Sequence, residues 1–533
     1  MSVVTDDFAE FAAPEAERRA TVGAGAGDSA GAPAAPATCP ADGPTVGAGI
    51  GPAVEPAAVA PYDDGPLGWD GYGSARQRAQ ERTGESESVV CGLARVAGVK
   101  TVLVSFEFGF LGGSLGERTG DRLVAAWDRA RELRLPVVTL IATGGSRMQE
   151  GMRALTQLQR VAGRSALNRA ARLPQVAVLR DPTTGGGWAT LGAGADVVLA
   201  LPGAQVGFAG SRVRPAGADP YAYSAEGQVA AGQADAVVPP DKLRTVLCRW
   251  LRLLSPGGDG APAADAAPVV RPDATASQDE AAEAAPPEAS PAGTAPPEAA
   301  PATTDPAEAN PATTAAPPPN ALGTSELPAS GWEAVCSARD ARRPRAAAYL
   351  EAYFDWREEI SGDRCGGTDP GIRCGFGRRE GRTIAFAAQC GTAVRPAGFR
   401  TAARLIRMAD RLGIPVLTLI DTPGAANDPA AERAGAGAAI ADVFAALASV
   451  RTPVTSLLIG EGGSGGALAL AAPGRLWATP DSYFSVIAPE AAAAILKRDP
   501  DAVRDTADQL RLRPQDLLDL GLIRGVVPPP ASQ

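Results

Sequence analysis

Two glycine clusters are the part of this sequence best suited to chemistry. The chain reads GEGGSGGALAL from Gly460 to Leu470, directly after the apolar run PVTSLLI, and DPTTGGG from Asp181 to Gly187. In both places a predicted strand leads through a short polar turn into adjacent glycines and a helix of small residues. Glycines that open a helix leave backbone N–H groups unshielded, with the positive end of the helix dipole behind them. Each cluster therefore predicts a hole for an oxyanion.

Other interpretations of the glycines remain. They can simply let a helix pack closely on a sheet. The spacing Gly460-x-Gly462-x-x-Gly465 also fits the dinucleotide-binding fingerprint. The helix that follows is too short for that fold, however, and the first cluster lacks the spacing. No Gly-Lys-Ser/Thr follows either cluster, which excludes a P-loop.

Composition narrows the chemistry further. The 533 residues include no histidine, which excludes Ser-His-Asp and Cys-His catalysis and any metal held by histidine. Seven scattered cysteines without a C-x-x-C pair argue against a zinc ribbon and against a disulfide framework. The formal charge of −10 disfavours nucleic acid as a partner. The sequence predicts no membrane span and no signal peptide at the acidic start, and so a cytoplasmic protein.

Two Ala/Pro-rich stretches divide the chain into two globular regions. Residues 1–60 and 256–331 are rich in Ala, Pro, Gly and acid, and no aromatic residue lies between Trp250 and Trp332. Such segments cannot bury a core, so they are predicted to be a disordered N-terminal segment and a disordered linker. The remaining domains are then 61–255 and 332–530.

The two regions repeat each other. LRLPVVTLIATGG in the first region corresponds to RLGIPVLTLIDTPG in the second. The prolines that open two strands, Pro136 and Pro174, lie 38 residues apart, as do Pro415 and Pro453. Strands that alternate with helices predict an α/β fold with largely parallel, buried strands. The shared order of strands, turns and spacings indicates an internal duplication.

Longer motifs resemble a known family. FEFGFLGGSLGERTGDRL, TGGSRMQEG, DPTTGGG and GFAGSRV resemble the β subunit of the carboxyltransferase of bacterial acetyl-CoA carboxylase. IDTPGA, AAER, GEGGSGGALAL and YFSVIAPEAAAAIL resemble its α subunit. The resemblance covers nearly all of 65–255 and 340–527. It implies two tandem crotonase-like ββα-spiral domains joined by a disordered linker, with both subunits fused in one chain.

The resemblance also implies a reaction. A carboxyl group moves from carboxybiotin to acetyl-CoA and gives malonyl-CoA. Because the biotin ureido anion that is left can take the α-proton of the thioester, the enzyme needs no strong base of its own. It needs two oxyanion holes, and the family pattern assigns the thioester to Gly185 and Gly186 and biotin to Gly465 and Gly466. Strict alignment of the repeats would choose Gly186 and Gly187 in the first half instead.

The other site residues follow from the same resemblance. The acyl-CoA is expected beside Thr143, Gly144, Gly145, Ser146 and Arg147 and beside Phe208, Ala209 and Gly210. Biotin is expected beside Thr422, Pro423, Gly424, Gly462 and Gly463. Three arginines are candidates for contacts with CoA phosphates: Arg118, Arg122 and Arg147. Asp181 and Glu461 are either proton relays or, more commonly for such carboxylates, acceptors for N–H groups of their own loops.

The chain also departs from the family. The β subunit usually begins with a four-cysteine zinc ribbon, but here only Cys39 precedes Cys91, so no zinc is expected. The family's Gln-Lys-Gly reads Gln389-Cys390-Gly391, and its Tyr after TPGA is Ala426. These changes bear on both the acyl specificity and the biotin contacts, and they favour a specialised enzyme.

The expected partners follow from what the chain lacks. It has neither an Ala-Met-Lys-Met biotinylation site nor an ATP-binding module. Biotin carboxylase and a biotin carboxyl carrier protein that delivers carboxybiotin are therefore the implied partners. A homodimer or higher homo-oligomer is expected. Two alternatives stay open: a decarboxylating carboxyltransferase that acts on a malonyl thioester, and a non-catalytic assembly subunit.

Overall fold

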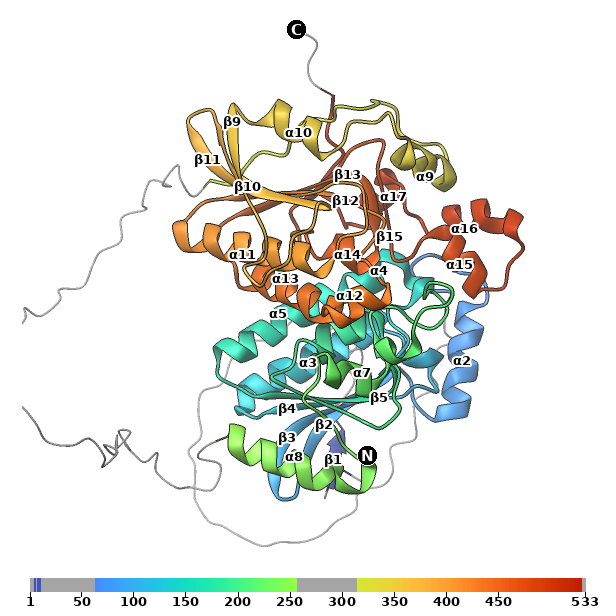
Figure 1. Ribbon diagram of the computed structural model, residues 1–533. Helices are drawn as coiled ribbons and strands as arrows, with labels where there is room; N and C mark the ends of the chain where they lie inside the picture. The colour runs from blue at the N-terminus through green and yellow to red at the C-terminus, as the bar shows by residue number, and fades with distance from the viewer. Residues whose placement is uncertain (1–3, 6, 11–62, 256–313, 530–533) are drawn as a thin grey trace, which may run out of the picture.

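The computed structural model describes residues 4–5, 7–10, 63–255 and 314–529. Each half of the chain forms one α/β unit around its own sheet, and the two units stack on each other (Figure 1). The predicted α/β class and the two tandem domains are confirmed. Within the described residues no helix is both long and apolar enough to cross a membrane.

The sheet of the first half has eight strands, in the order β1-β2-β3-β4-β5-β6-β8 with β7 beside β5. β1 to β3 pair antiparallel, and β3 to β6 pair parallel. All seven residues of β4 are buried, as expected of a parallel strand covered on both faces. The strands are β1 (Asp7–Glu10), β2 (Val89–Val96), β3 (Val99–Phe106), β4 (Val137–Thr143), β5 (Gln175–Thr184), β6 (Val197–Ala200), β7 (Val206–Gly207) and β8 (Ala236–Val237).

Helices cover both faces of this sheet (Figure 1). Leu243, Leu247 and Leu251 of α8 pack in one cluster with Val138 and Val176 of the sheet. The other face carries α3 and α5. The helices are α2 (Tyr72–Thr83), α3 (Glu117–Leu133), α4 (Gly151–Leu155), α5 (Gln157–Ala170), α6 (Gly185–Gly187), α7 (Ala225–Ala230) and α8 (Pro240–Leu254), with a π-helical turn η3 (Trp188–Gly192) and a 3₁₀ turn η4 (Pro220–Tyr223).

The second half has a seven-stranded sheet in the order β14-β13-β12-β11-β10-β9, with β15 beside β13. Its strands are β9 (Trp356–Ile360), β10 (Ile372–Arg379), β11 (Arg382–Gln389), β12 (Val416–Thr422), β13 (Val454–Gly463), β14 (Leu476–Ala478) and β15 (Tyr483–Ser485). Its helices are α9 (Gly331–Arg339), α10 (Ala346–Tyr353), α11 (Pro396–Leu412), α12 (Pro429–Arg433), α13 (Ala436–Ser449), α14 (Ser464–Leu468), α15 (Pro489–Ile495), α16 (Val503–Gln509) and α17 (Pro514–Asp519).

The duplication inferred from the sequence is visible in the strand register. Val137 of β4 pairs with Gln175 of β5, and Val416 of β12 pairs with Val454 of β13, so both pairs join residues 38 apart. The N–H groups of Val137 and Val416 donate to the carbonyls of the prolines that open the next strand, Pro174 and Pro453, both at 2.9 Å. Both registers then shift near the strand ends, before Thr143 and before Thr422.

The two halves share one large hydrophobic cluster, and each half also has a cluster of its own. One cluster of buried residues joins α3 and α5 of the first half to α11 and α13 of the second. Figure 1 shows these helices between the two sheets. Trp188 of η3 is 1 % exposed and lies against α13, where a Cβ on Gly437 would overlap its indole. The halves are therefore joined by packing as well as by the chain.

The predicted disordered segments fall mostly outside the described residues, and their described parts correct the prediction. Asp7–Glu10 form the edge strand β1 against β2, and Val4 is buried among Leu103 and Val138. Residues 314–330, here called the strap, run along the second half. Ala316 and Ala321 of the strap are buried in the core beneath α10.

Candidate active site at the glycine turns

The two glycine turns have the same backbone conformation. β5 ends at Thr184, and Gly185 follows with φ +65°; β13 ends at Gly463, and Ser464 follows with φ +51°. The strand pairs Thr143–Thr183 and Thr422–Gly462 fix the same register. Gly185 is therefore equivalent to Ser464, and the pair equivalent to Gly465 and Gly466 is Gly186 and Gly187. The strand register therefore agrees with the strict repeat alignment, and the assignment of the first oxyanion hole to Gly185 and Gly186 by the family pattern stays a prediction.

Close packing explains some of the glycines and not others. A Cβ on Gly187 would overlap the Thr143 side chain, and one on Gly466 would overlap the backbone N of Ala425. A Cβ on Gly465, in contrast, would lie 3.6 Å from the ring of Phe208, which is ordinary van der Waals contact. Gly465 has no positive φ to account for it either. Packing thus requires Gly187 and Gly466 but leaves Gly465 unexplained.

The predicted acyl-CoA loop adjoins the first turn. The Gly145 N–H donates to Thr143 Oγ1 at 3.1 Å, and a Cβ on Gly145 would lie 3.7 Å from the Gly185 Cα. Ser146 bridges to Leu115 and holds the loop against the start of α3. Gly144, which donates its N–H to the Gly112 carbonyl at 2.9 Å, is exposed beside them.

The predicted biotin-side loop adjoins the second turn in the same way. The Gly424 N–H donates to Thr422 Oγ1 at 3.1 Å. A Cβ on Gly463 would overlap the Pro423 carbonyl, and one on Gly462 would lie 2.8 Å from Phe484, so both glycines are needed for packing. Each half therefore places its two predicted loops side by side.

Phe208, Ala209 and Gly210 lie between the two turns. The Phe208 ring faces Gly465 of the second half, as the 3.6 Å approach shows. A Cβ on Gly210 would lie 3.6 Å from the side-chain oxygen of Thr184, the residue before the first glycine turn. One segment of the first half thus lies between Thr184, which precedes the first glycine turn, and Gly465, which is predicted for the biotin side.

A carboxylate from the second half holds this segment. Glu432 Oε1 accepts the Ala209 N–H at 3.0 Å, and a Cβ on Gly207 would lie 3.2 Å from the same oxygen. Glu432 is 1 % exposed, and burial raises its pKa to about 7. Arg214 also faces the segment: its Nε donates to the Ala209 carbonyl at 3.1 Å, and its guanidinium stacks on Tyr223.

Arg147 is buried in the first half and does not reach the surface, where contact with the phosphates of CoA was predicted. It is 1 % exposed and forms ion pairs with Glu87 and Glu150. Although burial opposes it, the Arg147 guanidinium lowers the pKa of Glu87. Arg122 is also buried and donates to the Val89 carbonyl at 2.9 Å. The expectation that Arg147 and Arg122 meet CoA phosphates is therefore wrong, and only Arg118 of the three is exposed.

The two acidic residues at the turns bind neighbouring elements. Asp181 is exposed and accepts the Gln205 N–H at 2.9 Å. Glu461 accepts from the Tyr483 hydroxyl at 2.5 Å and from Arg339 Nε at 3.1 Å. These contacts fix the ends of β5 and β13 to the strands and helix beside them.

Two side chains that sequence reasoning did not assign to the site support the second turn. Gln389 is fully buried; its Nε2 donates to the Gly466 carbonyl at 3.0 Å. Asp421 accepts the Glu461 N–H at 3.1 Å and pairs with Arg343. Both lie at the carboxyl ends of adjacent parallel strands, the one signal in the sequence that places them near the turn.

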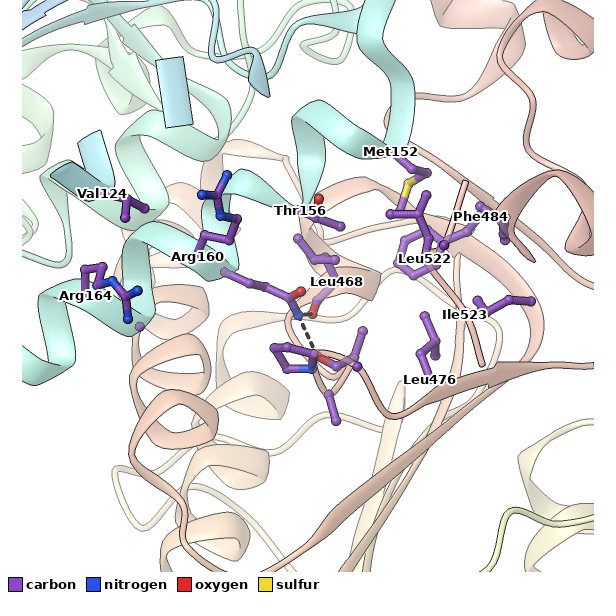
Figure 2. Close-up of a pocket in the computed structure, with 18 residues that line it drawn as sticks. Val124, Met152, Thr156, Arg160, Arg164, Leu468, Leu476, Phe484, Leu522 and Ile523 are labelled. Carbon is purple, nitrogen blue, oxygen red and sulfur yellow. Dashed lines mark hydrogen bonds between the residues drawn. The ribbon is translucent and has the colours of Figure 1, made fainter. Parts of the chain in front are cut away.

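A cavity of about 380 Å³ lies close by, between the halves (Figure 2). Gln159 of α5 crosses it and donates to the carbonyls of Leu468 and Ala471, at 3.1 and 2.5 Å. The wall is mostly apolar, and none of the predicted site residues lines it. Its apolar lining residues include Val124, Met152, Leu468, Leu476, Phe484, Leu522 and Ile523.

No cluster of three or more metal-ligating side chains occurs among the described residues. Six cysteines in those residues are free, and Cys39 lies outside them.

Comparison with known proteins identifies the family. A family profile described as acetyl co-enzyme A carboxylase carboxyltransferase-like matches residues 328–533, and a carboxyl transferase domain profile matches residues 71–234. Acetyl-coenzyme A carboxylase carboxyl transferase subunits beta/alpha from Saccharopolyspora erythraea is 34 % identical over 89 % of this chain and 78 % of that protein. The protein of the same name from Salinispora arenicola is 38 % identical over 85 % of this chain and 75 % of its own length.

A third relative carries a broader name. The probable biotin-dependent acyl-coenzyme A carboxylase beta3 subunit of Mycobacterium bovis is 32 % identical over 86 % of this chain and 83 % of that protein. Both halves of the chain, in the same order, are thus shared with these relatives. The chain belongs to the acetyl-CoA carboxylase carboxyltransferase family and is the carboxyltransferase of a biotin-dependent acyl-CoA carboxylase.

Proposed function

We propose that this carboxyltransferase moves a carboxyl group from carboxybiotin to acetyl-CoA and gives malonyl-CoA. The thioester oxyanion is assigned to the first glycine turn, at Gly186 with Gly185 or Gly187, and the biotin ureido oxyanion to Gly465 and Gly466. Acetyl-CoA is the substrate named for the carboxylases of the relatives from Saccharopolyspora and Salinispora. The single observation that carries the assignment is Gly465, which packing does not require and which faces the Phe208 segment of the other half.

The remaining assignments follow the sequence prediction. Thr143 to Ser146 and Phe208 to Gly210 would lie along the acyl-CoA, and Thr422 to Gly424, with Gly462 and Gly463, along biotin. A biotin carboxylase and a carrier protein would supply carboxybiotin, in the cytoplasm, for fatty acid or related synthesis. We propose that the chain acts as a homo-oligomer and needs no zinc. The crotonase-like assignment of each half belongs to the same proposal.

The two turns can be tested separately by carboxyl transfer between malonyl-CoA and free biotin. Gly465→Val should lower kcat/KM by about 100-fold or more, the scale of a lost oxyanion donor, and should raise the KM for biotin. For the first turn, a Cβ on Gly186 would lie 2.5 Å from Leu158, so Gly186→Ala is combined with Leu158→Ala. That double variant should raise the KM for acyl-CoA, and Leu158→Ala alone is its matched control.

The assay also addresses the alternatives. Forward rates with acetyl-, propionyl- and butyryl-CoA measure acyl preference, and a reaction that runs only from malonyl-CoA to biotin would favour a decarboxylating enzyme. A folded wild-type protein without transfer in either direction would favour an assembly subunit. Full activity in Gly465→Val would remove the biotin assignment.

A further inference from the structure

The contact between Glu432 and the Phe208 segment crosses from one half of the molecule to the other. Glu432 belongs to α12, whose first turn is capped by Asp428, with Asp428 Oδ1 accepting the N–H groups of Ala430 and Ala431 at 2.9 and 3.0 Å. This cap fixes the direction of α12 and carries Glu432 toward the first half. Because Asp428 caps the helix and Glu432 is buried, the fold sets the position of the Glu432 side chain.

The Glu432 carboxylate binds backbone N–H groups of the other half, whereas a structural ion pair would bind a cationic side chain. Ala209 donates its N–H to Oε1 at 3.0 Å, and the N–H of Phe208 also stabilises the charged form. Within the described residues, the buried Oε2 has no hydrogen-bond partner. A buried carboxylate that is not neutralised by a salt bridge costs stability. The presence of this carboxylate at the Phe208 segment therefore indicates a role other than stability.

The Phe208 segment is where the two glycine turns approach each other. The Phe208 ring lies beside Gly465, and Gly210 lies beside Thr184. A shift of the backbone at Ala209 would therefore move both contacts together. Gly207 permits the close approach, since a Cβ there would lie 3.1 Å from Tyr223 and 3.2 Å from Glu432.

We propose that Glu432 is a positioning residue for carboxyl transfer: by binding the backbone of Ala209, it sets the separation of the two glycine turns across the halves of one chain. This inference rests on the proposed use of both turns in one reaction. Glu432 acts through the Phe208 segment and contacts neither substrate in the proposed arrangement.

The charge of Glu432 changes near neutral pH. Burial raises its pKa to about 7, against the effect of the Ala209 and Phe208 N–H groups and of Arg214, while Asp428 raises it further. Tyr223 faces the same site and stacks with Arg214, and its pKa is raised by burial and by Glu432. A charged carboxylate accepts stronger hydrogen bonds than a neutral acid, so the segment should be held more firmly above pH 7.

The first test measures position without any substrate. Hydrogen exchange of the amides of Phe208 and Ala209 is compared in the wild-type full chain, Glu432→Ala and Glu432→Gln. We expect exchange at these amides to rise about tenfold or more in Glu432→Ala and to stay near wild type in Glu432→Gln at pH 6, because the amide oxygen still accepts the N–H. Wild-type exchange rates in Glu432→Ala would overturn the proposal.

The second test measures transfer. Glu432→Ala should lower kcat by about tenfold, Glu432→Gln should match wild type at pH 6, and it should fall about threefold below wild type at pH 8.5. Arg433→Gln is the matched control, because Arg433 forms a half-exposed ion pair with Asp219 across the same junction. It should leave kcat unchanged.

The outcomes separate this inference from the proposed function. Glu432→Ala with wild-type kcat, Glu432→Gln as slow as Glu432→Ala at pH 6, or Arg433→Gln as slow as either would overturn the inference. If the wild-type chain transfers no carboxyl group while exchange at Ala209 still depends on Glu432, the proposed function fails and the contact remains structural only.

Discussion

Two neighbouring glycines of the second turn differ in what a methyl group would meet. At Gly465 it would touch the ring of Phe208 at an ordinary distance, whereas at Gly466 it would overlap the backbone of Ala425. Gly465→Ala should therefore leave the melting temperature unchanged or raise it, since alanine is favoured over glycine in a helix by up to about 1 kcal/mol. Carboxyl transfer should nevertheless fall about tenfold or more, because the methyl group shields the N–H beside the proposed oxyanion.

Gly466→Ala is the matched control. It should lower the free energy of unfolding by about 1–3 kcal/mol through overpacking. Thermal unfolding and the transfer assay are measured on both variants. Equal losses of stability in the two variants would show that Gly465 is also a packing glycine.

At this scale the sequence showed which residues repeat but not what they contact. The paired glycines were visible because both clusters follow a strand at the same place. The partners of Arg147 and Glu432 were not, since Glu87 lies 60 residues from Arg147 and Ala209 lies 223 residues from Glu432. From sequence alone Arg147 is a candidate ligand for phosphate, and only the structure shows that it pairs with the buried Glu87.

The strap shows how a short element of small residues contributes to stability. The Ala316 carbonyl accepts from Thr455 Oγ1 at 2.7 Å, and the Pro317 carbonyl accepts from the Tyr353 hydroxyl at 2.7 Å. Deleting 314–328 would leave these hydroxyls without acceptors and would uncover the core beneath α10. We expect a loss on the order of 3–5 kcal/mol in unfolding free energy, measured by chemical denaturation.

An equally long deletion within the linker, of residues 270–284, is the control for the strap. Its composition predicts no effect on stability or on carboxyl transfer. If both deletions leave the denaturation midpoint unchanged, the strap contributes nothing to the fold.

Elements with strong periodic patterns were predictable, and short ones were not. The prolines before β4, β5, β12 and β13 marked strands whose register the structure confirms. The edge strand Asp7–Glu10 and the strap were missed because four residues carry little periodicity and because Ala and Pro predict disorder wherever they gather. Both segments are ordered by their contacts with a globular half of the molecule. Composition alone does not reveal such contacts.

The largest buried cluster of the molecule belongs to both halves. Residues of α5 and α13 belong to the same buried cluster, and Trp188 fits against Gly437. Each half expressed alone would expose this apolar face and should aggregate. Two fragments cut near residue 285 and co-expressed should instead associate and transfer carboxyl groups. Co-purification through a tag on one fragment measures this.

Gly437→Leu provides the control for that association, because its side chain would take the space of the Trp188 indole. It should weaken co-purification of the fragments and leave the strap contacts unchanged. Independent, soluble halves that do not bind each other would contradict a shared core.

The position of the Phe208 segment has a consequence for protein synthesis. Since one chain brings both glycine turns together, every completed translation product carries them in a one-to-one ratio. Relatives of this architecture made as two polypeptides would depend on balanced expression of two genes, and any excess of one would leave an apolar helix layer uncovered. Fusion makes that balance independent of messenger levels.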